Sequence, residues 1–245
     1  GGGGGGPVLW TGCRVAATIS TTFAAVEEHP EEMPGPKISA PVAVLAQRKR
    51  KLVNFVYGEV EPESVAAILD VVQPRDGEVF VDLGSGAGKV VLSAALLYPN
   101  LRAARGFEMM RGYMADAERA TRLLQDAESV MAPVTWVQGD FVELFPGGTN
   151  FSADQGDRIG WDDATIVFIC STCFEEEQMA AIAVCADRLP GGTRLVTLDK
   201  MLPSAQFQVI AVVQCGGSWG DTEAYVHIKR EQPTSSSAAE DQEEK

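Results

Sequence analysis

The stretch Val79–Lys89 reads VFVDLGSGAGK and decides the fold of this chain. An apolar run ends at Asp82, and three glycines, Gly84, Gly86 and Gly88, follow before a helical pattern begins. Glycine lets the backbone turn tightly and approach a ligand where a Cβ would collide. The start of a helix also offers free N–H groups and the positive end of its dipole. The stretch therefore predicts a strand, a ligand-binding turn and a helix, an arrangement that suits a nucleotide-like ligand.

The glycine spacing separates two kinds of nucleotide-like ligand. It is GxGxG, whereas the dinucleotide fingerprint is GxGxxG, and Lys89 stands where the third glycine of that fingerprint belongs. The carboxylate of Asp82 can pair with a cationic amino group, a need that a pyrophosphate would not create. This favours S-adenosylmethionine (SAM) over NAD; the alternative is a turn that merely joins strand to helix. The expected cofactor-binding residues of this stretch are Asp82, Gly84, Ser85, Gly86 and Gly88.

Acidic residues recur at the ends of the next two apolar runs. Glu108 ends RAARGFE, close to the roughly 20-residue offset at which an acid meets ribose hydroxyls in Rossmann-like sites. An exposed Glu that caps the following helix is the alternative. Asp140 and Phe141, in VQGDF, follow the third run, where an acid can accept from an adenine amino group and an aromatic ring can cover the base. We expect these three residues to complete the cofactor site.

The rest of the pattern alternates short apolar runs with helical segments, which indicates βαβ units and a largely parallel sheet. Helices are expected over 62–72, 89–97, 111–127 and 175–189. Strands are expected over 78–83, 102–108, 134–137, 164–170 and 194–198, with a hairpin of 207–214 and 224–229. Trp219 is expected to pack in the hairpin turn, with substrate contact as the alternative. The predicted fold class is α/β: a Rossmann-like, mostly parallel sheet of seven strands with helices on both faces and a C-terminal antiparallel hairpin.

Both ends of the chain lack a pattern that could form a core. Residues 1–36 combine a glycine run, small residues and a Pro- and Glu-rich stretch, so we expect a flexible N-terminal segment. Residues 231–245 are mainly Ser, Ala and acidic residues, which predicts a disordered acidic tail. The SAM-dependent methyltransferase domain is expected over 37–230. No apolar run approaches the roughly 20 residues of a membrane span, so no membrane partner is expected.

The composition fits a soluble intracellular protein. Hydrophobic residues make up 45% of the 245 residues, and five cysteines without a framework-like spacing predict reduced thiols. Cys170 and Cys173 form a CxxC, but neither a second pair nor a histidine at ligand spacing accompanies them, so no metal site is expected. A net charge of −14 argues against indiscriminate binding to nucleic acid.

One basic cluster runs against the acidic balance of the chain. Its residues are candidates for a weak nucleic-acid contact; a solvated helix face or a nuclear-import-like patch are the alternatives. The cluster consists of Arg48, Lys49, Arg50 and Lys51.

Five segments occur in the order typical of one family: Tyr57-Gly58-Glu59, VFVDLGSGAGK, GFE, GDF and VFICSTCF. Over Phe55–Lys200, and more loosely to Arg230, the chain resembles the non-SET, Rossmann-fold histone-lysine methyltransferases of the disruptor-of-telomeric-silencing type. The resemblance implies that the loop with Tyr57 and Glu59 covers the methionine end of the cofactor. It also implies that Phe174 lines the channel through which the substrate amine enters.

The resemblance implies a SAM-dependent protein-lysine N-methyltransferase, with a histone as substrate and the nucleus as location. The candidate catalytic residues are Tyr57, Glu59, Cys170 and Phe174. Cys170 stands where relatives usually carry Asn, and a thiol cannot replace the two donors and the acceptor of the amide. The alternatives are a cytoplasmic methyltransferase for a non-histone protein or a small molecule, and a SAM-binding scaffold without turnover.

Overall fold

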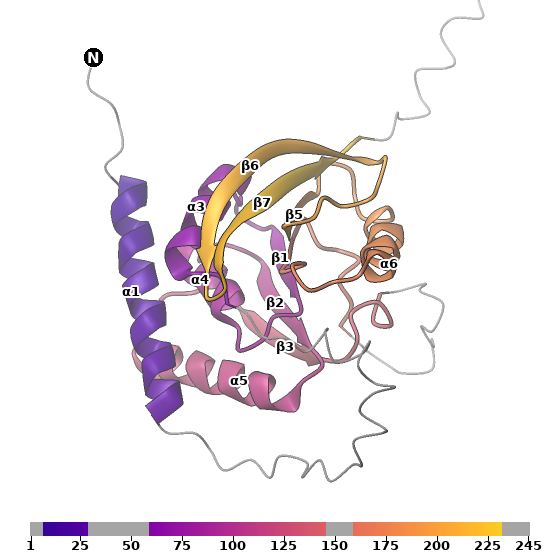
Figure 1. Cartoon of the computed structure of the whole chain (residues 1–245). Helices are drawn as coiled ribbons and strands as arrows, with labels where there is room; N and C mark the ends of the chain where they lie inside the picture. The colour runs from indigo at the N-terminus through magenta and orange to yellow at the C-terminus, as the bar shows by residue number, and fades with distance from the viewer. Residues whose placement is uncertain (1–6, 29–58, 146–158, 232–245) are drawn as a thin grey trace, which may run out of the picture.

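The computed structural model describes residues 7–28, 59–145 and 159–231 (Figure 1). In this part of the chain, seven strands form one sheet in the order β3-β2-β1-β4-β5-β7-β6. Five strands are parallel: β1 (Val79–Leu83), β2 (Ala103–Glu108), β3 (Val134–Gln138), β4 (Ile166–Ile169) and β5 (Arg194–Leu198). The antiparallel pair is β6 (Phe207–Gly217) and β7 (Gly220–Lys229), with β7 beside β5. The predicted Rossmann-like sheet with a C-terminal hairpin is confirmed.

Helices cover both faces of the sheet, as predicted. On one face lie α3 (Pro62–Val72), α4 (Lys89–Leu97) and α5 (Arg111–Asp126), and on the other lies α6 (Glu176–Ala186). Neighbouring residues of each strand point to opposite faces. Phe80 therefore packs in the cluster that contains α3 and α4, whereas Val81 packs in the cluster that contains α6.

Helix α6 is shorter than the sequence predicts. It ends at Ala186, and the expected continuation to Leu189 is a turn. The ammonium of Lys229, on β7, donates to the carbonyl of Asp187 at 2.6 Å and to that of Leu189. A cation near the end of a helix can bind its free carbonyl groups, so Lys229 of β7 holds the turn that follows α6.

The N-terminal helix α1 (Pro7–Glu28) corrects the expected flexible segment 1–36. Ile19, Phe23 and Val26 are buried and pack with Leu92 of α4 and Leu124 of α5. These apolar residues recur every three or four positions, as one face of a helix requires. Small residues between them weaken the pattern in the sequence, which is why the prediction is wrong for 7–28. Figure 1 shows α1 lying along α3, α4 and α5.

The C-terminal hairpin is longer than predicted. Its strands extend to Gly217 and Gly220, so the turn consists of Ser218 and Trp219 alone. The ring of Trp219 lies so close to Gly217 that a Cβ there would be 2.8 Å from it. Val60 forms a β-bridge with Gly217, which attaches the segment before α3 to the end of the hairpin.

The remaining residues of the predicted terminal segments, Glu231 excepted, lie outside the described ranges.

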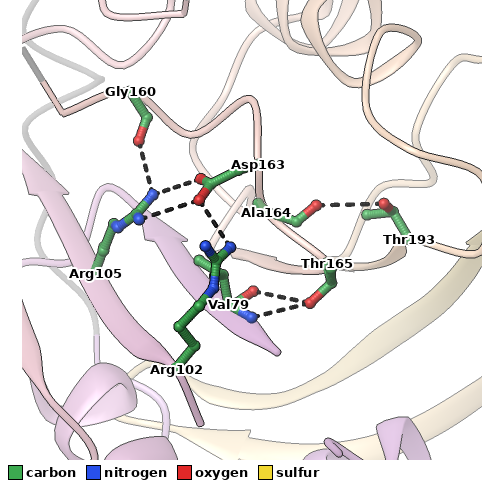
Figure 2. A network of polar contacts seen from close by, with 8 residues as sticks. All are labelled: Val79, Arg102, Arg105, Gly160, Asp163, Ala164, Thr165 and Thr193. Carbon is green, nitrogen blue, oxygen red and sulfur yellow. Dashed lines mark hydrogen bonds and ion pairs between the residues drawn. The ribbon is translucent and has the colours of Figure 1, made fainter. Parts of the chain in front are cut away.

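A polar network ties together the amino-terminal ends of the strands (Figure 2). Arg105 donates to both carboxylate oxygens of Asp163, at 2.5 and 3.2 Å, and Arg102 donates to the same carboxylate at 3.0 Å. The hydroxyl oxygen of Thr165, just before β4, accepts from the N–H of Val79 on β1 at 3.0 Å. These bonds fix β1, β2 and β4 relative to one another at this edge of the sheet.

None of the described helices is long and apolar enough to cross a membrane. Within the described ranges, no group of three or more His, Cys, Asp or Glu side chains is placed to hold a metal ion. The five cysteines are free thiols.

Candidate active site

A cavity of about 580 Å³ opens at the carboxyl-terminal ends of β1, β2 and β4. The strand order reverses between β1 and β4, and this is the position at which open α/β sheets bind their ligands. The turns after β1, β3 and β4 line the cavity, together with the end of β2, the segment before α3 and the hairpin turn. Of the expected site residues, Gly88 does not line it, Tyr57 lies outside the described residues, and all others do.

The glycine turn after β1 follows a backbone path that favours glycine. Gly84 and Gly86 have φ angles of 85° and 52°, in the left-handed region. The N–H groups of Gly84 and Ser85 both donate to the carbonyl of Phe107, each at 2.9 Å. A Cβ on Gly84 would also lie 3.8 Å from the ring of Phe174. The turn is therefore fixed to the end of β2 and brings bare backbone to the cavity.

Gly88, expected among the cofactor-binding residues, has a packing role instead. A Cβ at this position would lie 2.3 Å from the ring of Trp136, and φ is 91°. Gly106, on β2, makes room for the same ring, since a Cβ there would lie 2.4 Å from it. The indole N–H of Trp136 donates to the hydroxyl oxygen of Thr121 at 3.1 Å. The third glycine thus lets an anchored indole pack against the turn.

Glu108 joins the glycine turn to the start of α5. One carboxylate oxygen accepts from the N–H of Gly86 at 2.9 Å, and the other accepts from the N–H of Met110 at 2.7 Å. Met110 is the N-cap residue of α5, so Glu108 also fixes the backbone at the point where α5 begins. Each carboxylate oxygen can accept a further bond. Glu108 is therefore held rigidly in the cavity wall with acceptor capacity left for a ligand hydroxyl.

Asp82 is a buried carboxylate whose Oδ1 has no hydrogen-bond partner among the described residues. Only 2% of the residue is exposed. Burial and then the nearby charge of Glu108 raise the pKa of Asp82 well above its usual range. The hydroxyl of Ser85, also in the cavity wall, is buried and likewise has no partner in the described part of the chain. Burying such groups without partners is costly, which indicates a position that receives a donor or a cation.

The turns after β3 and β4 meet across the cavity through two aromatic rings. Phe141 and Phe174 stack with their centroids 6.0 Å apart and their planes inclined by 23°. The carboxylate of Asp140 accepts from the N–H of Val142 at 2.8 Å, which holds the first of these turns. The carbonyl of Phe174 accepts from the ammonium of Lys200, which holds the second. The sequence predicts both aromatic residues in the site, and the structure brings them together.

Cys170, at the end of β4, lines the cavity as a protonated thiol. Burial and then the charge of Asp82 raise the pKa of Cys170 to about 12. The thiolate is the nucleophilic form, so this thiol is unreactive at neutral pH. Cys173 also lines the cavity. The two thiols of the CxxC are free and form part of the cavity wall.

Lys89 and Tyr113 are cavity residues that the sequence analysis did not predict, and Trp219 is one for which it preferred a packing role. Lys89 had one signal, since it replaces the third glycine of the dinucleotide fingerprint. Its ammonium forms an ion pair with Glu59. Tyr113 is on α5, where no motif marks it. Trp219 reaches the cavity because the hairpin strands extend up to it, which the sequence did not predict.

The cavity is acidic. Within the described residues, its wall contains one lysine, Lys89, and five carboxylates: Glu59, Asp82, Glu108, Asp140 and Glu177. Low-dielectric walls strengthen the field of such a cluster, which attracts cations and repels anions. The arrangement suits a cationic ligand and disfavours a pyrophosphate.

The sheet order, the reversal between β1 and β4 and the glycine turn define the Rossmann-like fold of class I methyltransferases. Residues 37–214 match the protein family described as "Histone methylation protein DOT1", and the chain belongs to that family. The resemblance inferred from the five sequence segments is thereby confirmed.

Two curated relatives are histone-lysine N-methyltransferases described as H3 lysine-79 specific. The protein of Eremothecium gossypii is 34% identical over 161 residues, which are 63% of this chain and 26% of that protein. The protein of Caenorhabditis elegans is 26% identical over 164 residues, which are 65% of this chain and 16% of that protein. The chain thus matches about a quarter or less of the length of these relatives.

A solved structure similar in fold is TrmN from Thermus thermophilus. It superposes with a TM-score of 0.52 at 14% identity, covering 74% of this chain and 52% of that one. At this identity the likeness concerns the fold alone.

Proposed function

We propose that this chain is a SAM-dependent protein-lysine N-methyltransferase whose substrate is a histone. The observation that carries the proposal is the buried carboxylate of Asp82 beside the glycine turn, in an acidic cavity, whose Oδ1 has no partner among the described residues. Membership of the family and the names of the two relatives support both the reaction and the substrate.

The residues present fit the cofactor. S-adenosylmethionine supplies a methyl group on a sulfonium and carries an ammonium group. Asp82 is the acceptor for that ammonium, because its Oδ1 is buried and has no described partner. Glu108 is assigned to the ribose hydroxyls, and Asp140 with Phe141 to the adenine. Gly84, Ser85 and Gly86 form the turn that lines the cavity between Asp82 and Glu108.

The substrate amine must lose a proton before it can attack. A lysine amine has an ordinary pKa of about 10.4, so deprotonation at pH 7 costs roughly 4–5 kcal/mol. The stacked rings of Phe141 and Phe174 give an apolar wall that disfavours the ammonium form. Cys170 stays protonated there and does not compete with the amine as a nucleophile. Holding the amine against this wall, oriented toward the methyl group, then accelerates the transfer.

Two features concern the substrate. A histone substrate places the protein in the nucleus, and the basic residues 48–51, proposed for a weak nucleic-acid contact, lie outside the described residues. Cys170 supports a second candidate, a methyltransferase for a non-histone protein or a small molecule. A thiol cannot offer the two donors and the acceptor of the Asn that the family resemblance implies at this position.

The test is a tritiated-methyl transfer assay with nucleosomes, free core histones and a whole-cell protein extract in parallel. Gly86→Arg is the loss-of-binding control, because it fills the ligand side of the turn; circular dichroism checks that it folds. We expect label on a nucleosomal histone that disappears in Gly86→Arg.

Label on another protein alone would retain the reaction and discard the histone. Absence of label with measurable binding of S-adenosylhomocysteine would favour a small-molecule acceptor or a scaffold. Absence of binding would overturn the assignment of the cavity to SAM.

A further inference from the structure

Helix α1 lies outside residues 37–214, which match the family, and yet it packs behind the cavity. Its buried residues share one cluster with Ala87 of the glycine turn and Leu92 of α4. Trp136, which packs against Gly88, is partly buried against the same cluster. The glycine turn is therefore held between the cavity on one side and α1 on the other.

Lys89 is the point at which α1 and the cavity meet. It is the first residue of α4, where the positive end of the helix dipole disfavours a cation. Its ammonium pairs with Glu59 and lies 5.0 Å from the ring centroid of Phe23 on α1. Both charged side chains are largely buried, with 19% of Lys89 and 25% of Glu59 exposed. A carboxylate and an aromatic face thus hold an ammonium in an otherwise unfavourable place.

The backbone of Glu59 is hydrogen-bonded to the hairpin turn. Its N–H donates to the hydroxyl oxygen of Ser218 at 3.1 Å, and its carbonyl accepts from the N–H of Ser218 at 2.8 Å. Ser218 precedes Trp219, and both Glu59 and Trp219 line the cavity. A continuous series of contacts therefore runs from Phe23 through Lys89 and Glu59 to the hairpin turn.

We infer that Lys89 is a positioning residue through which α1 sets the place of Glu59 and of the hairpin turn at the cavity. Phe23 confines the ammonium, and the ammonium holds the Glu59 carboxylate. The effect on ligand affinity rests on the proposed function, whereas the ordering of the hairpin turn does not. Helix α1 is then part of the site rather than an accessory to the domain.

The first readout is hydrogen exchange in the ligand-free full chain, followed at the Ser218 amide. Lys89→Met and Phe23→Leu keep apolar bulk but remove the charge or the aromatic face. We expect exchange at Ser218 to become about 10-fold faster in Lys89→Met and about 5-fold faster in Phe23→Leu. In Phe23→Tyr, which keeps the aromatic ring, exchange at Ser218 should remain as slow as in the unmodified chain.

The matched control is Ile19→Val. Ile19 is fully buried on the same face of α1, whereas the ring near the Lys89 ammonium is that of Phe23, so Ile19→Val tests loss of helix packing. We expect Ile19→Val to lower the thermal midpoint without changing exchange at Ser218. Equal exchange at Ser218 in Phe23→Leu and Ile19→Val would overturn the inference.

The second readout is the dissociation constant of S-adenosylhomocysteine, measured by calorimetry on the same variants. We expect it to rise about 5-fold in Phe23→Leu and to stay unchanged in Ile19→Val and Phe23→Tyr. Unchanged affinity in Phe23→Leu would contradict the inference for the site. Failure of the unmodified chain to bind would instead contradict the proposed function, and the exchange result would still decide on Lys89.

Discussion

The two edges of the parallel sheet treat their charged groups in opposite ways. At the amino-terminal edge, Arg105 and Arg102 share the carboxylate of Asp163 (Figure 2). Arg194 pairs there with Glu78 at 2.5 Å. At the carboxyl-terminal edge, the buried Oδ1 of Asp82 has no described partner. One edge completes its ion pairs within the protein, and the other leaves acceptors for a ligand.

This difference separates stability from binding along the same strands. Burial acts to raise the pKa of Asp163, but the hydrogen bond and charge of Arg105, together with the charge of Arg102 and a backbone hydrogen bond, lower it overall. The carboxyl of Asp82 has its pKa raised by burial and by Glu108. Substitutions at the first edge should therefore change folding and leave ligand affinity alone. Substitutions at the second should change affinity and can even stabilise the ligand-free chain.

The largest effect is expected from Arg194→Met. Arg194 is 7% exposed, and its removal leaves the half-buried carboxylate of Glu78 without its ionic partner, with only the Arg75 N–H still donating to it. Breaking such a pair costs about 3–5 kcal/mol in the free energy of unfolding, measured by urea titration. The exposed Arg102 is the matched control, and Arg102→Met should cost at most about 1 kcal/mol. A loss of S-adenosylhomocysteine affinity in folded Arg194→Met would contradict the separation of stability from binding between the two edges of the sheet.

The second effect is expected from Asp82→Asn, which removes the carboxylate charge and keeps the shape. Calorimetry should find the dissociation constant of S-adenosylhomocysteine raised about 100-fold, since a charged hydrogen bond to the ligand is lost. The free energy of unfolding should rise by about 1–2 kcal/mol at pH 7, because a neutral amide replaces a buried carboxyl group whose Oδ1 has no described partner.

The sign of the pH dependence sharpens the Asp82 test. The folded pKa of Asp82 is raised, so its contribution to stability is full below the ordinary value of about 3.9 and is lost as pH rises through the folded pKa. The stabilisation by Asp82→Asn should therefore grow with pH. Asp140→Asn is the control, because the Asp140 carboxylate already accepts from Val142. A gain in stability from Asp140→Asn as large as that from Asp82→Asn would contradict this account.

The sequence predicted the sheet well because strand and glycine signals are local. The run VFVDL and the turn after it follow from residues that are neighbours in the chain. The hairpin strands were cut short because Gly216 and Gly217 were interpreted as turn residues, although they pair with Gly220 and Asp221. Helix α1 was missed because its buried face carries few large side chains and its stability depends on packing against α4 and α5.

The candidate site was predictable where one residue stands at the end of one strand, as Asp82 and Glu108 do. It was not predictable where the position depends on two distant segments. Lys89 depends on Phe23 and Glu59, and Trp219 depends on the length of the hairpin. Gly88 was misassigned because a glycine that binds a ligand and one that makes room for an indole look alike in sequence.

The smallest effect is expected at His227, a buried ionisable group that lies outside the cavity and has both ring nitrogens bonded. Nε2 accepts from the N–H of Leu202 at 3.2 Å, so Nδ1 carries the proton and donates to the carbonyl of Leu195 at 3.0 Å. The neutral ring fits both partners, whereas a protonated ring would lose the bond from Leu202. Burial lowers the pKa of His227 accordingly.

The folded pKa of His227 is lowered, so its contribution to stability is full above the ordinary value of about 6.5 and is lost as pH falls toward the folded pKa. The free energy of unfolding should therefore fall as the pH is lowered from 7.5 to 5.5. His227→Gln keeps a donor and an acceptor without a titrating group, so its unfolding curves should change less with pH over this range. Equal pH dependence in the two proteins would contradict the neutral tautomer. Burial destabilises the charged form of both side chains. The stability contribution of Asp82 is therefore lost as the pH rises, and that of His227 is lost as the pH falls.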